Sequence, residues 1–145
     1  MVTVERSALV EFSADDLYAL VEDVEAYPEF LPWCTAVEVA SREGRHAVVT
    51  LHIRYRGLRQ RFTTRNTFTR GERIEMDLVD GPFRELRGAW RFVPIGAGAC
   101  RVELKLAYEL ASPLLARAMG AAFDHIANSL VDAFVRRIEA LHGPP

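Results

Sequence analysis

The sequence predicts an α+β fold in which a curved antiparallel sheet of about seven strands packs around one long C-terminal helix. Six segments between residues 35 and 110 have strand-like alternation and are separated by short turn sequences. Residues 113 to about 141 have helical spacing and no internal proline. Because parallel neighbours would need long crossover connections, the short turns indicate an antiparallel meander. A chain of 145 residues suits a single domain, expected over residues 1–145.

The N-terminal part of the chain predicts a strand followed by a short helix. Residues 2–12 alternate apolar and polar side chains with an interruption near Ser7, which is typical of a strand that is either regular or bulged. Residues 13–24 have helical spacing, and Ser13 with Asp16 three positions later forms a capping-box-like start. The helix is expected to end near its last apolar residue.

An aromatic stretch, AYPEFLPWC, follows this helix and fits neither a regular helix nor a central strand. Pro28 and Pro32 interrupt it, and three aromatic side chains lie around them: Tyr27, Phe30 and Trp33. Connecting segments normally lie on the surface and are polar, so this apolar content needs a separate explanation.

The turn sequences between the expected strands are REGR, RGL, TRGER, VDGPF and PIGAGA. Asp80-Gly81 suits a tight hairpin turn, because glycine accepts the positive φ that such turns require. In the strand that follows, Leu86, Trp90 and Phe92 alternate with charged residues. Trp90 is therefore expected on the concave face of the sheet.

The C-terminal helix is expected to start with Ser112 as its cap and Pro113 in its first turn. About 28 residues at 1.5 Å each give a length of roughly 42 Å, enough to cross a small domain. Its apolar stripe is expected to comprise Leu115, Met119, Ala122, Phe123, Ile126, Leu130, Ala133, Phe134, Ile138 and Leu141. A curved sheet around one helix leaves a gap that can serve as a ligand cavity.

Several polar residues of this helix are expected off the stripe, in solvent: Asp124, His125, Asn128 and Asp132, with Val131 and Val135 on the same outer side. Arg137 interrupts the stripe. Its long side chain is expected either to reach solvent or to turn into the cavity and orient a ligand carbonyl.

Composition and motifs exclude several classes of protein. Cys34 and Cys100 are too few for a disulfide framework or a zinc site, and Cys34 is expected to be a packing residue. The four histidines have no metal-site spacing, and the chain lacks a P-loop, GxSxG or HExxH motif, so no catalytic or metal-binding residue is assigned. Without a signal peptide or a long apolar run, we expect a cytoplasmic protein, with peripheral contact at the inner membrane face left open.

Arginines are concentrated in one part of the chain although the net charge is −2. The segment from Arg54 to Arg73 holds seven arginines and one acid, whereas residues 11–41 hold eight acids and no lysine or arginine. Two interpretations stay open: a solvated outer sheet face, or a footprint for rRNA phosphates or anionic lipid headgroups. The expected contact residues form two sets, and the members of each set project from one face of their strand because they are an even number of positions apart. The sets are Arg54 with Arg56, and Arg59 with Arg61 and Arg65.

Three motifs give a specific family resemblance over about residues 3–140: YPEFLPWC (27–34), FTTRN (62–66) and LVDGPFRELRGAWRF (78–92). They resemble the coenzyme Q-binding and RatA ribosome-association-toxin family of START-like, polyketide cyclase-like (SRPBCC) proteins. The resemblance implies a helix-grip fold. It also implies either binding of an isoprenoid quinone, as in mitochondrial members, or binding of the large ribosomal subunit, which blocks subunit association. The wider fold also hosts aromatases and cyclases.

In a helix-grip fold the aromatic stretch would lie beside the open end of the cavity. It would form either an apolar lip at the entrance or a plug that closes the core. The Asp80–Phe83 turn is likewise either a plain turn or a second gate opposite Trp33.

The main functional expectation is a carrier that binds an isoprenoid quinone, or a related ubiquinone-like lipid, without transforming it. The alternative is a RatA-like toxin that binds the large ribosomal subunit, and a cyclase enzyme is a third interpretation. No cofactor is expected beyond the bound lipid, and the oligomeric state stays open. The residues expected to line the cavity are Phe30, Leu31, Trp33, Phe62, Phe83, Trp90, Met119, Phe123, Ile126 and Leu130.

Overall fold

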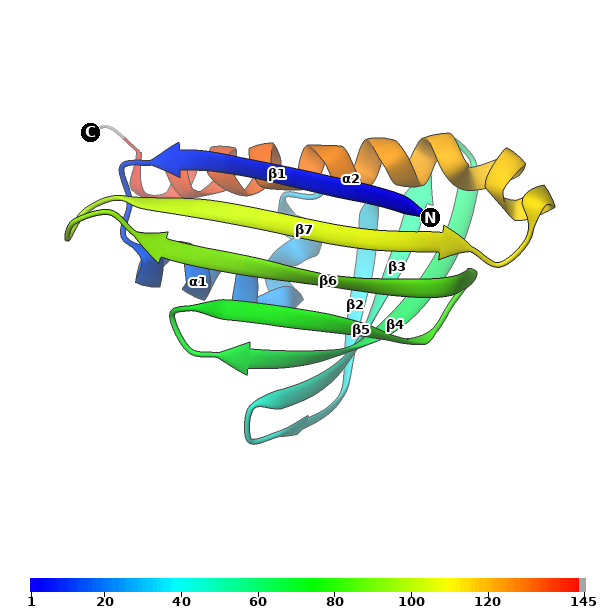
Figure 1. The fold of residues 1–145 in the computed structure, drawn as a ribbon, viewed down its shortest axis with the longest axis horizontal. Coiled ribbons are helices and arrows are strands. Elements are labelled where there is room, and N and C mark those ends of the chain that lie inside the picture. The colour runs from blue at the N-terminus through cyan, green and yellow to red at the C-terminus, as the bar shows by residue number, and fades with distance from the viewer. Residues whose placement is uncertain (144–145) are drawn as a thin grey trace.

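The computed structural model describes residues 1–143 as one seven-stranded antiparallel sheet with a long helix at the end of the chain (Figure 1). The elements are β1 Val2–Val10, α1 Ala14–Glu22, the 3₁₀ helix η1 Val24–Glu29, β2 Cys34–Glu43, β3 His46–Tyr55, β4 Leu58–Thr69, β5 Arg73–Asp80, β6 Phe83–Pro94, β7 Cys100–Leu110 and α2 Pro113–His142. The predicted fold class and the six-strand meander are confirmed.

The strands follow the order β1-β7-β6-β5-β4-β3-β2, so β1 and β2 form the two edges of the sheet. The sheet bends strongly: β1 crosses in front of α2 in Figure 1 and β7 and β6 follow below it, whereas β2, β3 and β4 turn behind the helix. Two aromatic contacts join β6 to α2, Phe83 to Phe123 and Trp90 to Phe134. The core therefore lies between the concave face of the sheet and this helix, as predicted.

The first strand is regular rather than bulged. Its pairing with β7 runs without a shift from Val2 opposite Tyr108 to Val10 opposite Cys100. The interruption in its apolar pattern arises because Arg6 lies on the same face as the buried Val4. The Arg6 guanidinium donates a hydrogen bond to Asn128 of α2, with 3.1 Å between Nε and Oδ1.

The short helix α1 is capped as predicted, because the Ser13 hydroxyl accepts a hydrogen bond from the Asp16 amide. It ends at Glu22, and η1 then accommodates Pro28, whose ring would break a longer α-helix. The elements α1 and α2 contact each other as well as the sheet.

The long helix begins with the predicted Ser112 cap, whose hydroxyl accepts a hydrogen bond from the Leu115 amide. Some expectations for its faces are wrong, and Val135, expected on the solvated side, is half-buried against the core. Val131 is buried, and α2 packs against α1 as well as against β1 and β7, so its buried arc is wider than one stripe. Leu141 is half exposed in the last turn.

Glycine at position 88 lets β5, β6 and β7 approach closely. A Cβ atom there would lie 2.8 Å from Leu106 Cδ1 and 2.9 Å from the Lys105 carbonyl oxygen. Backbone cannot move aside as a flexible side chain can, so we expect Gly88→Ala to lower the free energy of unfolding by about 1–3 kcal/mol. Urea unfolding followed by circular dichroism measures this change.

The matched control is Gly98→Ala, since an added Cβ at Gly98 meets nothing within 4 Å. Its free energy of unfolding should stay within about 0.5 kcal/mol of the native value. Equal stability of the two variants would show that position 88 tolerates a side chain.

The two cysteines are free and buried at the starts of β2 and β7. Burial raises the pKa of the Cys34 thiol to about 11 and also raises that of Cys100. Because the thiolate is the reactive form, both thiols should react slowly with a disulfide reagent at pH 7.5 in the native protein and quickly after unfolding. Rapid modification of Cys34 in the folded protein would contradict its packing role.

A candidate ligand cavity and an arginine-rich surface

A largely apolar cavity of about 100 Å³ lies between the concave face of the sheet and α2. Seven of the ten predicted residues line it: Trp33, Phe62, Phe83, Trp90, Phe123, Ile126 and Leu130. Leu31 and Met119 are buried but lie outside this lining, and Phe30 lines a separate surface groove instead. Whether these residues hold a ligand stays a prediction.

The polar groups of the cavity include two residues that the sequence analysis missed, Thr64 and Asn66 on β4. They belong to the FTTRN motif, which was noted only as part of the resemblance. The Thr64 hydroxyl donates to Asn66 Oδ1 at 2.7 Å, while Asn66 Nδ2 has no hydrogen-bond acceptor among residues 1–143. This amide nitrogen can therefore donate to a carbonyl or hydroxyl oxygen of a ligand.

Two tyrosines in the lining have their hydroxyl groups directed to protein acceptors. Tyr27 donates to the Val21 carbonyl oxygen, and Tyr108 donates to the Asp124 carboxylate. Burial raises the pKa of both phenols, so they stay protonated and keep these bonds near neutral pH. Asp124 was expected to be a solvated residue, and this is corrected: it is half-buried and joins α2 to β7.

The aromatic stretch packs against α2. Tyr27, Leu31 and Trp33 are buried, and the rings of Tyr27 and Phe30 contact the Phe134 ring at centroid distances of 5.3 and 5.2 Å. In this conformation the segment closes the core, as the plug interpretation expects. It could act as a lip only after it moves away from Phe134.

The Asp80–Phe83 segment is a tight turn in which Gly81 has a φ of +151°. Phe83 packs inside the cavity wall, where its ring contacts Phe62 and Phe123 at centroid distances of 5.7 and 5.0 Å. This geometry fits the plain-turn interpretation and makes Phe83 part of the wall.

The size of the cavity limits what it can hold. Pockets for drug-sized ligands usually measure about 300–1,000 Å³, several times the 100 Å³ found here. An isoprenoid quinone would fit only after α2 and the aromatic stretch had moved apart.

Arginines dominate the outer face of β4. Phe62, Thr64 and Asn66 point to the cavity, so Arg61 and Arg65 point outward. Arg59 points to the same side, and in the register of the sheet it lies opposite Arg54 of β3. The expectation that Arg56 extends the strand is wrong, because it lies in the turn with a φ of +48°.

None of the five predicted contact arginines has a carboxylate oxygen within 4 Å among residues 1–143. The arginines of β5 and β6 differ, because each pairs with a glutamate: Arg73 with Glu75, Arg84 with Glu109, Arg87 with Glu85, and Arg91 with Glu103. The outer face of the sheet therefore has a neutralised part and an uncompensated basic part.

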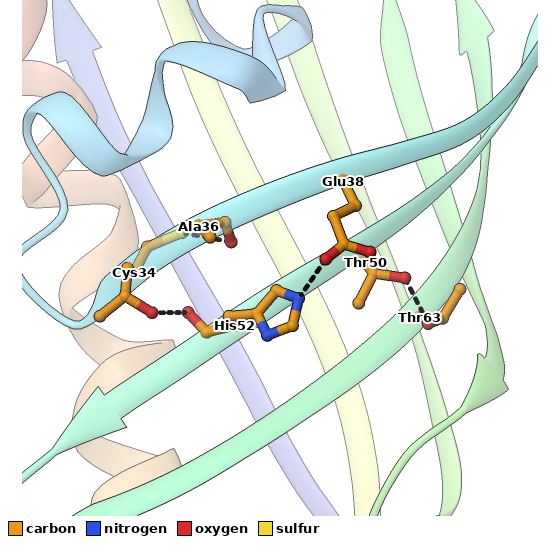
Figure 2. Close-up of polar contacts among 7 residues, drawn as sticks. Cys34, Ala36, Glu38, Thr50, His52 and Thr63 are labelled. Atoms are coloured by element: carbon orange, nitrogen blue, oxygen red, sulfur yellow. Dashed lines mark hydrogen bonds and ion pairs between the residues drawn. The ribbon is translucent and has the colours of Figure 1, made fainter.

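Polar contacts also join the neighbouring strands β2, β3 and β4 (Figure 2). Thr50 of β3 and Thr63 of β4 share a hydrogen bond of 2.6 Å, whereas the buried Cys34 donates within β2 to the Ala36 carbonyl oxygen. Glu38 contacts His52 at 3.0 Å rather than an arginine. This surface therefore leaves the guanidinium groups available to a partner.

The described part of the chain, residues 1–143, holds no helix that is long and apolar enough to cross a membrane. The same residues contain no group of three or more His, Cys, Asp or Glu side chains placed to hold a metal ion.

Comparison with solved structures supports the fold. The aromatase/cyclase Zhui of Streptomyces matches at a TM-score of 0.85 and 21% identity, over 95% of this chain and 93% of that one. A START superfamily protein of Mycobacterium smegmatis matches at a TM-score of 0.79 and 24% identity, over 96% and 98% of the two chains. At such identities the likeness concerns the fold alone.

Comparison with protein families and curated sequences identifies the relatives. The family model described as polyketide cyclase / dehydrase and lipid transport matches residues 10–135. Proteins named ribosome association toxin RatA match at 43% identity in Vibrio cholerae, over 99% of both chains, and at 44% in Pseudomonas aeruginosa, over 97% of both. The mitochondrial coenzyme Q-binding protein of Drosophila melanogaster is 27% identical, over 97% of this chain and 60% of that protein. The chain therefore belongs to the polyketide cyclase / dehydrase and lipid transport family, and within it to the group that includes RatA and the coenzyme Q-binding proteins.

Proposed function

We propose that this protein acts as a single domain that associates with the large ribosomal subunit in the cytoplasm and hinders subunit joining. The relatives named ribosome association toxin support this function over the quinone carrier that was the main expectation, because they are more similar and match nearly end to end. The contact surface is the arginine hairpin, defined as Arg54, Arg56, Arg59, Arg61 and Arg65 on β3, β4 and their turn.

The observation that carries this proposal is the absence of carboxylate partners around these arginines within residues 1–143. A guanidinium group binds phosphate through two parallel hydrogen bonds, and a free one need not first leave an ion pair. Each arginine that binds an rRNA phosphate also releases counterions, which favours association at low salt.

The separation of acidic and basic residues along the chain would also orient the protein as it approaches RNA. The net charge of −2 gives no overall attraction to RNA, and residues 11–41 carry eight acids without a lysine or arginine. A polyanion therefore repels one part of the molecule and attracts the hairpin, which favours a single mode of approach.

Replacing three outer-face arginines should weaken ribosome binding. We expect the triple variant Arg59→Gln, Arg61→Gln, Arg65→Gln to bind purified large subunits at least about tenfold more weakly. The dependence of log K on log salt should also become less steep by about two to three units, because up to three phosphate contacts are lost. Co-sedimentation over a salt series measures both quantities.

The matched control is the triple variant Arg84→Gln, Arg87→Gln, Arg91→Gln on β6, which removes the same charge from paired arginines. Its binding to large subunits should stay close to that of the native protein. A hairpin variant that binds as tightly as the native protein, with the same salt dependence, would count against the arginine hairpin as the contact surface.

A second candidate function is binding of a small apolar molecule with one oxygen acceptor, and the free Asn66 amide nitrogen favours it. The lining contains no Asp, Glu, His, Lys or Arg side chain, so we propose binding without chemical transformation. Apolar burial would contribute about 25 cal/mol per Å². A quinone head has suitable carbonyl oxygens, but its isoprenoid tail requires the cavity to open.

Purification without detergent, organic extraction and mass spectrometry test this second function. We expect an apolar, oxygen-bearing compound to be retained by the native protein and lost from Asn66→Leu, because the leucine cannot donate a hydrogen bond. Arg65→Gln, one position away on the outer face, should retain the compound. An empty extract from native protein made in quinone-containing cells would rule out the carrier and leave ribosome association unaffected.

A further inference from the structure

A groove of about 450 Å³ lies on the surface between the Phe30–Trp33 segment, the β3–β4 turn and the C-terminal half of α2. Four arginines line it, and its lining contains no aspartate or glutamate. Two of them, Arg54 and Arg56, come from the arginine hairpin, whereas Arg136 and Arg137 come from α2. The groove thus joins charges that lie about eighty residues apart in the sequence.

Three of these guanidinium groups are free to bind an anion. Arg54, Arg56 and Arg136 are exposed and have no carboxylate oxygen within 4 Å among residues 1–143. Arg137 is held in place, with Nη2 3.3 Å from Glu29 and its guanidinium 5.0 Å from the centre of the Phe30 ring.

Arg137 also has a buried Nε atom without a hydrogen-bond partner among the described residues. Unsatisfied buried donors are uncommon in folded proteins, and an acceptor supplied by a bound molecule or water is one way to satisfy them. The groove therefore has both surplus positive charge and an unused donor beside it.

Aromatic surfaces lie among these charges. The rings of Tyr55 and His125 stack with centroids 5.4 Å apart and planes inclined by 22°. The Arg56 guanidinium lies 5.4 Å from the centre of the Tyr55 ring. His125 is exposed, as expected, and its ring stacks on that of Tyr55 at the groove wall.

We propose that the groove binds a nucleotide of a single-stranded RNA segment, with its phosphates on Arg54 and Arg136 and its base stacked on His125. This inference rests on the proposed ribosome association and names the kind of rRNA element that the protein contacts. Unpaired RNA is recognised by base stacking on aromatic side chains together with phosphate contacts, and the groove offers both. Its volume also suits a ligand of nucleotide size.

A membrane surface fits the groove less well. Peripheral membrane binding needs exposed apolar side chains that enter the lipid interface, in addition to basic residues. Among residues 1–143, the exposed large apolar side chains, which include Leu9, Val79 and Leu114, do not line the groove. The concave shape and the stacked rings favour an extruded base instead.

Fluorescence anisotropy with a labelled single-stranded RNA dodecamer of mixed sequence tests the phosphate contacts. We expect the double variant Arg54→Gln, Arg136→Gln to bind at least about tenfold more weakly. Its salt dependence should be less steep by about 1.4 units, at about 0.7 per lost single-strand phosphate contact. The control Arg101→Gln, Arg117→Gln removes two exposed arginines outside the groove, one from β7 and one from α2, and should bind like the native protein.

A second variant separates stacking from charge. His125→Ala should weaken RNA binding by about 5- to 150-fold, the range for a lost base–aromatic stack, while the salt dependence stays unchanged. Because His125, Arg54 and Arg136 are all exposed, these variants should keep the native unfolding midpoint.

The possible outcomes distinguish failure of the RNA-binding proposal for the groove from failure of the proposed ribosome association. In one outcome the native protein sediments with large subunits and the groove variants bind RNA normally. This result would overturn the proposal that the groove binds RNA, and ribosome association would stand. Native protein that binds the dodecamer through the groove but fails to sediment with large subunits would overturn the ribosomal role alone. Groove variants that lose binding to phosphatidylglycerol vesicles but keep RNA binding would show an anionic membrane as the occupant and overturn the RNA proposal.

Discussion

The contact between α2 and the concave face of the sheet is the interaction on which the rest of this structure depends. Seven antiparallel strands bend around one 30-residue helix, and Phe134, 1% exposed, is central to the contact. Its ring meets Trp90 of β6, Tyr27 of η1 and Phe30 of the following turn at centroid distances between 5.2 and 5.3 Å. The same side chain thus fixes the sheet, the helix and the aromatic stretch relative to one another. A large-to-small substitution in such a core removes both burial and packing contacts.

Strand β4 has two kinds of surface, because successive side chains point to opposite faces of the sheet. Alternate residues face the cavity, where Thr64 and Asn66 add polarity to an otherwise apolar wall, and the intervening arginines face outward. Register places Arg54 opposite Arg59, and it also places Arg73 opposite Arg91, where Glu75 and Glu103 form ion pairs with the two arginines. Like charges directly opposite each other are unfavourable in a sheet. Ion pairs offset this repulsion on β5 and β6, whereas Arg54 and Arg59 have no carboxylate oxygen within 4 Å among residues 1–143.

Local patterns in the sequence were sufficient to predict the helices and strands. Features that depend on contacts between residues distant in the sequence could not be predicted in this way. Alternation and turn residues predicted all seven strands, and Ser13 and Ser112 marked the helix starts because capping depends only on nearby backbone. Val131 and Asp124 were misplaced because their burial depends on other elements: α2 packs against β1, β7 and α1, and Asp124 accepts a hydrogen bond from Tyr108 of β7. Seven of the ten residues expected to line the cavity do so, but the sequence could not give the volume of the cavity. That volume depends on how closely α2 approaches the sheet.

The aromatic stretch connects the two proposed functions physically. Trp33 lines the inner cavity and also the surface groove, and Phe30 holds Arg137 on the groove side while it packs against Phe134 on the core side. A ligand too large for 100 Å³ can enter only if surrounding elements move, and movement of this segment would change the groove wall. A ligand in the cavity and RNA in the groove would then bias the same conformational equilibrium. Thermodynamic linkage requires each to change the affinity of the other by the same factor. The prolines at positions 28 and 32 restrict the backbone of this segment, so it would move largely as a unit.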